Sequence, residues 1–299
     1  MDPRTDPDPD ADTDDPRRGT AAPGAGPMLR RALAARAPGR SLLSPAAPAS
    51  VADVHAGRAA SLATLAASLD PHEWQAPTRF GRPVQAVLAH LLGQLERTAT
   101  ELGDGTFVAP AADDYDHWGV TEPFIERFGR GEPAALVAAL AEVADRVQAR
   151  CETLGGADDR ATRALVQSYE TWMHADDVRL SLGRAVDVPD PASLLALCNL
   201  AVGAVPLAVA LGGLVRADAH ARLVLTGPGG GVWVVALAPG EPAAPPGASA
   251  DVTIVAEGHG FCRLLHRQVL ASDVVADIEG DAALAAAVLA TVGSLAERT

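Results

Sequence analysis

The fold and the candidate site of this chain meet in one stretch, Ser168-Tyr-Glu-Thr-Trp-Met-His-Ala-Asp-Asp-Val-Arg-Leu-Ser-Leu-Gly183. Its apolar and aromatic residues recur at helical spacing and Gly183 is a typical stop signal, which together predict a helix from about residue 161 to 182. Glu170 and His174 are four residues apart, so they lie on one face of that helix. They can direct a carboxylate oxygen and an imidazole nitrogen at one point.

Three more helices are predicted before this one, from about residues 50 to 70, 83 to 102 and 133 to 154. Ser50 can cap the first, and Pro83 fits the first turn of the second. The segment from Gly103 to Gly131 is long and aromatic, and we expect it to be functional or partly helical. Four amphipathic helices of about twenty residues predict a four-helix bundle, which builds metal sites from side chains on facing helices.

The pattern changes after about residue 188. A long apolar helix, 192–216, precedes two β-branched runs around the glycines of 227–231, which predict a hairpin rather than a phosphate-binding loop. Further elements are expected at 251–256 (strand), 261–267 (helix), 274–278 (strand) and 281–296 (helix). The expected fold class is therefore α+β. It comprises a disordered acidic tail (1–48), a four-helix bundle with a metal site (49–188) and a smaller α+β domain (189–299).

Composition narrows the classes of partner. The 299 residues carry a net charge of -14, and the arginines form no dense run, so we expect no nucleic-acid partner. The long apolar run 194–215 is interrupted by glycines and a proline, so we expect a buried helix and no membrane partner. The first residues lack an apolar signal-peptide core, and we expect a cytoplasmic protein.

The chain has three cysteines, Cys151, Cys198 and Cys262, an odd number without a Cys-x-x-Cys pair. Disulfides and a cysteine-built metal site are therefore not expected. We interpret the three as small buried residues in a reducing compartment.

The candidate metal site uses residues from two helices. His90, in the second helix, could complete a set with Glu170 and His174, and three protein ligands with one open position are typical of catalytic zinc. Glu170 has apolar neighbours, and a buried carboxylate needs a partner such as Zn²⁺. Asp177, three residues after His174, could orient its imidazole. Two alternatives stay open: an ordinary Glu–His pair on a helix surface, and a metal-free buried polar network.

Short motifs spread along the chain also resemble those of a known protein family. In the first 188 residues it rests on Trp74-Gln-Ala-Pro-Thr, Val87-Leu-Ala-His90-Leu and Glu170-Thr-Trp-Met-His174-Ala-Asp-Asp177. In the last third it rests on Trp233-Val-Val, Ala250-Asp-Val-Thr-Ile, Leu264-Leu-His-Arg267 and Glu279-Gly-Asp281-Ala-Ala-Leu. In this order the motifs resemble the mycothiol-dependent maleylpyruvate isomerase family, over about residues 50 to 296. That family has a DinB-like four-helix bundle followed by a sterol-carrier-like domain.

The resemblance implies that His90, Glu170 and His174 bind a divalent metal, usually zinc, and that mycothiol is the thiol cosubstrate. One position departs from the family pattern. The family commonly has Gly-Trp-Thr/Ser-Val at the start of the second helix, where this chain has Gly81-Arg-Pro-Val84. The departure puts the substrate in doubt more than the metal.

The leading hypothesis is a zinc-dependent, mycothiol-using enzyme, a cis-trans isomerase or thiol S-transferase, that acts on a small electrophilic substrate through a metal-bound thiolate. Arg127, Arg130 and Arg267 are candidates for binding the substrate or the thiol. The alternative is a metal-containing protein that binds a small ligand without turnover. The expected partners are a small-molecule substrate and a low-molecular-weight thiol, and the chain is expected to be a monomer or homodimer.

Overall fold

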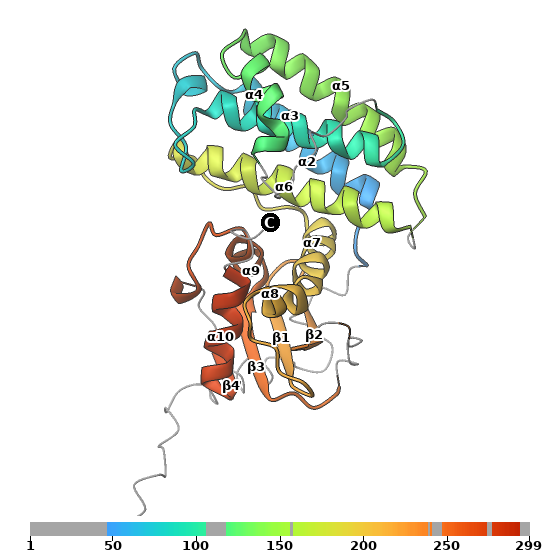
Figure 1. Ribbon diagram of the computed structural model, residues 1–299, viewed down its shortest axis with the longest axis vertical. Coiled ribbons are helices and arrows are strands. Elements are labelled where there is room, and N and C mark those ends of the chain that lie inside the picture. Colours follow the sequence, from blue (N-terminus) through green and yellow to red (C-terminus); the bar gives the residue numbers. More distant parts are fainter. Residues whose placement is uncertain are drawn as a thin grey trace, which may run out of the picture.

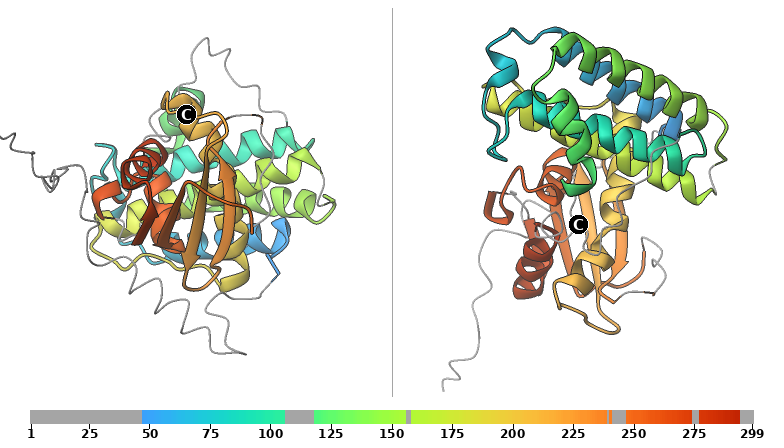
Figure 2. Two further views of the ribbon diagram at one scale, coloured as in Figure 1. Left: turned by 90° about the horizontal axis from the view of Figure 1, so that it is seen from below. Right: turned by 45° about the horizontal axis from the view of Figure 1, so that its top comes forward.

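The computed structural model describes residues 47–105, 118–155, 158–238, 240, 247–273 and 277–293. The acidic tail predicted for residues 1–48 lies almost wholly outside them. The described chain consists of a helical half, residues 51–181, and a mixed half of helices and strands, residues 191–293 (Figure 1). Figure 2 shows the long helices lying side by side across one end of the mixed half.

The helical half is built from four long helices at the predicted places. They are α2 (Val51–Ala67), α3 (Val84–Glu101), α5 (Pro133–Cys151) and α6 (Asp159–Ser181). Both α2 and α3 contact α5 and α6. Their apolar stripes meet in one core, because each helix turns its leucines, valines and alanines inward. Ser50 caps α2 as predicted, with its side-chain oxygen accepting from the backbone N–H of Asp53 at 3.1 Å.

Short elements connect these helices. The turn η1 (Glu73–Gln75) precedes α3, and η2 (Gly119–Thr121) and α4 (Glu122–Phe128) precede α5. The aromatic segment from Gly103 to Gly131 is therefore partly helical in its described part, as predicted. Gly183, the predicted stop signal, has φ +66, a conformation that glycine adopts without strain just after α6.

The mixed half is built around a four-stranded sheet in the order β2-β1-β3-β4. Its elements are α7 (Pro191–Gly203), α8 (Val205–Leu211), β1 (His220–Thr226), β2 (Gly231–Ala236), β3 (Val252–Glu257), α9 (Gly258–Leu265), η3 (Ala271–Asp273), β4 (Asp277–Gly280) and α10 (Ala282–Gly293). The predicted hairpin is the antiparallel pair β1–β2, and β3 runs parallel to β1 and antiparallel to β4. The chain is thus mixed helix and sheet, consistent with the α+β class. The three cysteines are buried with free thiols, so they lie in the core as predicted.

The prediction of one helix from 192 to 216 is wrong. The segment forms two helices that meet at Ala204, and the second ends at Leu211 before Gly212 and Gly213. Pro206 lies in the first turn of α8, where its missing N–H is tolerated, but it cannot continue the ladder of α7. Residues 191–211 are long and apolar enough to cross a membrane by length and composition alone, and half of them are buried, which is also true of core helices.

Helix α6 lies between the two halves and belongs to both cores. Tyr169, Trp172 and Met173 pack into the core of the mixed half, whereas Ala175 and Val178 pack into that of the helical half. The aromatic face seen in the sequence therefore faces the second half of the chain. The polar residues of α6 that fall between these two faces lie at the seam where the halves meet.

Candidate metal centre

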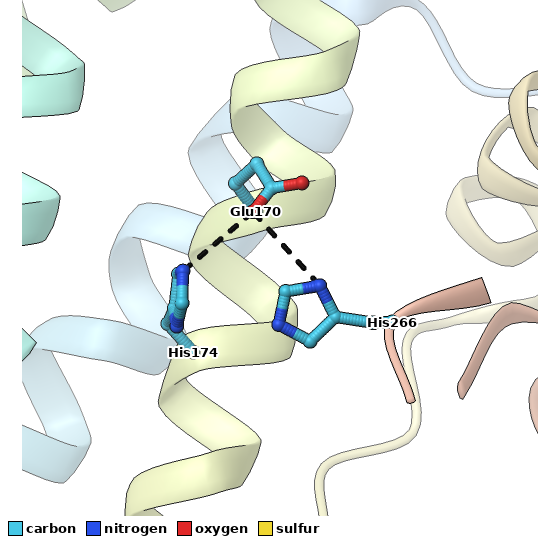
Figure 3. Close-up of side chains that lie close together, drawn as sticks. All are labelled: Glu170, His174 and His266. Atoms are coloured by element: carbon cyan, nitrogen blue, oxygen red, sulfur yellow. Dashed lines mark ion pairs between the residues drawn. The ribbon is translucent and has the colours of Figure 1, made fainter. Parts of the chain in front are cut away.

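Three side chains with metal-binding atoms converge at the seam: Glu170 and His174 from α6, and His266 from the turn after α9 (Figure 3). Their ligand atoms all lie within 4.8 Å of one another. Nε2 of His174 is 3.6 Å from Oε2 of Glu170, and Nδ1 of His266 is 3.9 Å from the same oxygen. Neighbouring ligands of a tetrahedral zinc ion lie about 3.3 Å apart, given bonds of about 2.0–2.1 Å. Small side-chain movements would therefore close the group around an ion.

Asp177 lies behind the two imidazoles. Its Oδ2 is 3.5 Å from Nδ1 of His174 and 3.4 Å from Nε2 of His266, and its side chain is fully buried. Burial raises the pKa of this carboxyl, but hydrogen bonding and charge interaction with the two histidines outweigh burial and hold the pKa well below its ordinary value. Asp177 therefore stays ionised and is placed to orient the rings. The predicted orienting role would apply to two imidazoles instead of one.

A polar clamp holds the turn that carries His266. Arg79 lies 2.8 Å from Asp177 through Nε, and its guanidinium donates to the backbone carbonyls of His266 and Arg267 at 3.0 and 2.9 Å. Gln268 donates to Asp177 at 3.0 Å and to a backbone carbonyl of α6 at 2.7 Å. Arg267 has φ +57, which turns the chain sharply between these contacts. The clamp fixes the turn against α6.

His90, the predicted ligand from α3, lies on the other side of His174. The two ring centroids are 5.1 Å apart, but His90 does not belong to the group whose ligand atoms lie within 4.8 Å. Its ring lies 4.1 Å from that of Trp118, and Nδ1 is 2.6 Å from Oγ1 of Thr121. Because this hydroxyl donates to the carbonyl of Trp118 at 3.0 Å, Nδ1 of His90 is the donor in that pair. Phe80 and Trp118 cover His174 with aromatic surface, at centroid distances of 5.4 and 6.2 Å.

The three arginines predicted to bind substrate are exposed. Arg127 lies over the ring of its neighbour Phe128, at 4.9 Å. Arg130 lines a polar cleft beside α3 together with Arg82. Arg267 follows His266 directly and offers its carbonyl to Arg79.

A second cleft, with a volume of about 350 Å³, has Glu170 on its wall. One wall is polar and comes from α3 and α6, with Gln94, Thr98 and Gln167 among its residues. The opposite wall is apolar and comes from the mixed half, with Leu200, Ala204, Leu207 and Leu265. Glu170 is 23% exposed, so a molecule in this cleft can reach the edge of the metal group.

His266 and the cleft were not predicted as parts of the site. His266 stands in the motif Leu264-Leu-His-Arg267, which signalled the second domain, but no spacing relates it to Glu170 because 96 residues separate them. The only hint of its role in the sequence was its place next to Arg267 in that motif.

Comparison with known proteins supports the fold. No family model matches the chain, and no curated protein matches its sequence. Among solved structures, mycothiol-dependent maleylpyruvate isomerase is similar with a TM-score of 0.50 and 16% identity, and a mutant form of that enzyme with 0.50 and 15%. Each alignment covers 76% of this chain and 91% of the other. At this identity the likeness establishes a shared fold, which agrees with the family resemblance at that level.

Proposed function

We propose that this chain is a metal-dependent enzyme that uses mycothiol, a low-molecular-weight thiol, to isomerise a small electrophilic substrate or to transfer the thiol to it. The observation that carries the proposal is the convergence of Glu170, His174 and His266 in front of buried Asp177. The shared fold with a mycothiol-dependent isomerase supports the choice of cosubstrate. Zinc is the proposed metal because imidazole nitrogens and carboxylate oxygens are among the ligands that it commonly binds.

The residues at the site fit a divalent cation. Glu170 supplies an anionic oxygen and His174 a buried imidazole with Asp177 behind it, the arrangement in which a carboxylate fixes a ligating ring. The resemblance adds His90 as the third ligand. When bound, such a metal would lower the pKa of a coordinated thiol, so that the nucleophilic thiolate exists at neutral pH.

The other residues of the site position and shield the reactants. Phe80 and Trp118 keep water from the α3 side of His174. The cleft beside Glu170 offers one polar and one apolar wall, which suits a small molecule with a polar and an apolar part. Arg127, Arg130 and Arg267 remain proposed contacts for anionic groups. We also propose that the helical half is a DinB-like domain ending near residue 188, and that the mixed half is a sterol-carrier-like domain.

The test is an activity assay on zinc-loaded protein. We expect thiol-dependent consumption of an activated double-bond substrate with mycothiol, and loss of that activity in Glu170→Gln. His72→Gln, an exposed histidine away from the group, is the matched control. Thiol-dependent activity that survives in the Glu170 variant would contradict the proposal. Zinc binding without turnover on a panel of electrophiles would favour the alternative, a small-ligand-binding protein whose ligand occupies the cleft.

A further inference from the structure

We propose that the cleft beside Glu170 binds an elongated amphipathic carboxylate, whose carboxylate group is held by Arg97 and Arg163 at one end of the cleft and whose reactive carbon lies at the Glu170 end. The inference rests on the proposed function for the reactive end, and it names the class of substrate on which that function would act. Neither arginine is among the three that the sequence predicted to bind substrate.

Two arginines and one carboxylate meet at the end of the cleft away from the metal group. Nε of Arg97 lies 3.0 Å from Oε1 of Glu101, and Nη1 of Arg163 lies 3.4 Å from Oε2 of the same carboxylate. Among the described residues that line the cleft, the other acid is Glu170, at the opposite end. One negative charge therefore faces two positive charges here. Arg163 is 60% exposed, and because a guanidinium carries five N–H donors, it can bind a carboxylate of a ligand as well.

The two ends of the cleft are separated by two turns of helix. α3 and α6 run antiparallel along it, since Thr98 donates to Gln167 at 3.3 Å and the later residue Glu101 pairs with the earlier residue Arg163. From Arg163 to Glu170 the axis of α6 advances about 10 Å. An extended chain advances about 3.5 Å for every three bonds, so a molecule of roughly eight or nine bonds in a row reaches from one end to the other.

Polar groups in the middle of the cleft bond to one another. The hydroxyl of Thr98 donates to the amide oxygen of Gln167, and the amide nitrogen of Gln167 donates to Thr171, also at 3.3 Å. All three side chains are buried. Because these hydrogen bonds are made within the protein, the stretch between the two ends needs no polar group on the ligand.

The opposite wall favours an apolar body. It is formed by Leu200, Ala204 and Leu207, with Leu265 from α9, and Val166 of α6 lines the same cleft. Leu207 is 52% exposed and Val166 43% exposed, so a hydrocarbon chain laid along them would remove apolar surface from water on both sides. The volume of about 350 Å³ lies within the range of small-molecule sites. A positive end, an apolar middle and a reactive end together specify the ligand class.

The first experiment measures the binding of unreactive straight-chain carboxylates by calorimetry with the full-length wild type. For chains of roughly four to ten carbon atoms, we expect affinity to rise about threefold with each added methylene until the cleft is filled. Primary alcohols of the same lengths should bind roughly tenfold more weakly, because they lack the charge that pairs with the arginines. Absence of binding, equal affinity of acids and alcohols, or no gain with length would overturn the inference.

Variants of the arginine end test where the carboxylate lies. Arg163→Gln should weaken binding of an acid that spans the cleft roughly tenfold and leave alcohol binding unchanged, whereas Arg163→Lys, which keeps the charge, should retain most of the affinity. Arg160→Gln is the matched control, because Arg160 lies on the same helix, is 52% exposed and pairs with Asp158, but does not line the cleft. An equal loss in the control would show that overall charge, not the cleft, attracts the acid.

A variant of the apolar wall tests the middle of the cleft. Leu207→Asn replaces a half-exposed side chain, so the fold should tolerate it. We expect the longest acids to lose about fivefold in affinity and the shortest to bind as before, because only the long chains reach this side chain. A uniform loss for all lengths, or none for any, would contradict the proposed placement of the chain.

The same titrations with zinc-loaded protein fix the direction of the ligand. We expect no gain in affinity for the unreactive acids, because the arginine end lies about 10 Å from Glu170. A gain that Arg163→Gln does not reduce would place the carboxylate on the metal and overturn the inference.

These outcomes are separate from those of the proposed function, since binding of the acids needs neither thiol nor turnover. If the acids bind with the expected dependence on length and on Arg163 while no electrophile is consumed, the proposed function fails and the carboxylate site stands. If thiol-dependent turnover occurs while acids bind no better than alcohols, the proposed function stands and the inference alone fails.

Discussion

His174 has a histidine on either side, His90 from α3 and His266 from the turn after α9. Different kinds of contact hold these two histidines in place. His90 sits in the middle of a long helix, fully buried, with its ring packed on Trp118. His266 sits in a turn that Arg79 fixes by donating to two of its backbone carbonyls while pairing with Asp177 of α6. Packing within one half fixes the first imidazole, whereas contact between halves fixes the second. Metal binding would therefore depend on how the two halves dock only if His266, in the turn, is a ligand.

The largest effect is expected from replacing His174, the central imidazole of the proposed metal site. His174→Ala removes the central imidazole, and we expect the zinc affinity to fall by roughly 100-fold or more, because the remaining groups no longer surround one point. Metal content of the purified protein and chelator competition measure it. A variant that keeps its zinc would leave a metal-free polar network as the better account of the whole cluster.

Next in size is the loss of the clamp. Arg79→Met leaves Asp177 buried with weaker compensation, and we expect the free energy of unfolding to fall by about 2 kcal/mol, less than for a fully buried pair because Arg79 is partly exposed. Zinc affinity should fall about tenfold, since the turn is no longer held. Urea unfolding of the metal-free protein and chelator competition check the two effects.

Arg146→Met is the matched control for that change. Arg146 is about as exposed as Arg79 and also forms an ion pair with a carboxylate, Glu96 on α3, but it does not line the cleft beside Glu170. We expect it to cost less than about 1 kcal/mol and to leave zinc affinity unchanged. Equal effects of the two substitutions would show that the clamp has no special role.

The difference between α3 and the turn after α9 also explains what the sequence could predict. The long helices and the hairpin follow from periodicity, caps and glycines, and the prediction failed where Pro206 divides one apolar run into two helices. Glu170 and His174 could be paired because helical geometry relates residues four apart. His266 could not be related to them, because its position depends on how two separately formed cores dock. The structure leaves His90 as a ligand implied by resemblance, adjacent to the group but outside it.

A smaller effect is expected on the α3 side. Thr121→Val removes the acceptor of the His90 Nδ1–H, and leaving that buried donor unsatisfied should lower the free energy of unfolding by about 1 kcal/mol. Zinc affinity should fall by less than in Arg79→Met, because His90, the third ligand of the proposed function, loses a partner that orients it but stays packed on Trp118. Unchanged affinity would instead indicate that His90 does not contact the metal. Thermal unfolding and chelator competition on the same samples decide between these outcomes.

The smallest effect concerns His55, a buried histidine of the helical half. Its Nε2 lies 3.0 Å from the carbonyl of Ala144. Burial lowers the pKa of His55 below its ordinary value, and the bond to Ala144 only partly opposes this. The folded protein thus binds the proton less readily than the unfolded chain, so stability is lost as the pH falls below about 6.5. In His55→Gln, whose amide can donate the same bond, the metal-free protein should lose less stability between neutral and mildly acidic pH. Urea unfolding at several pH values measures this, and parallel curves for the two proteins would mean that protonation of His55 does not set the acid sensitivity.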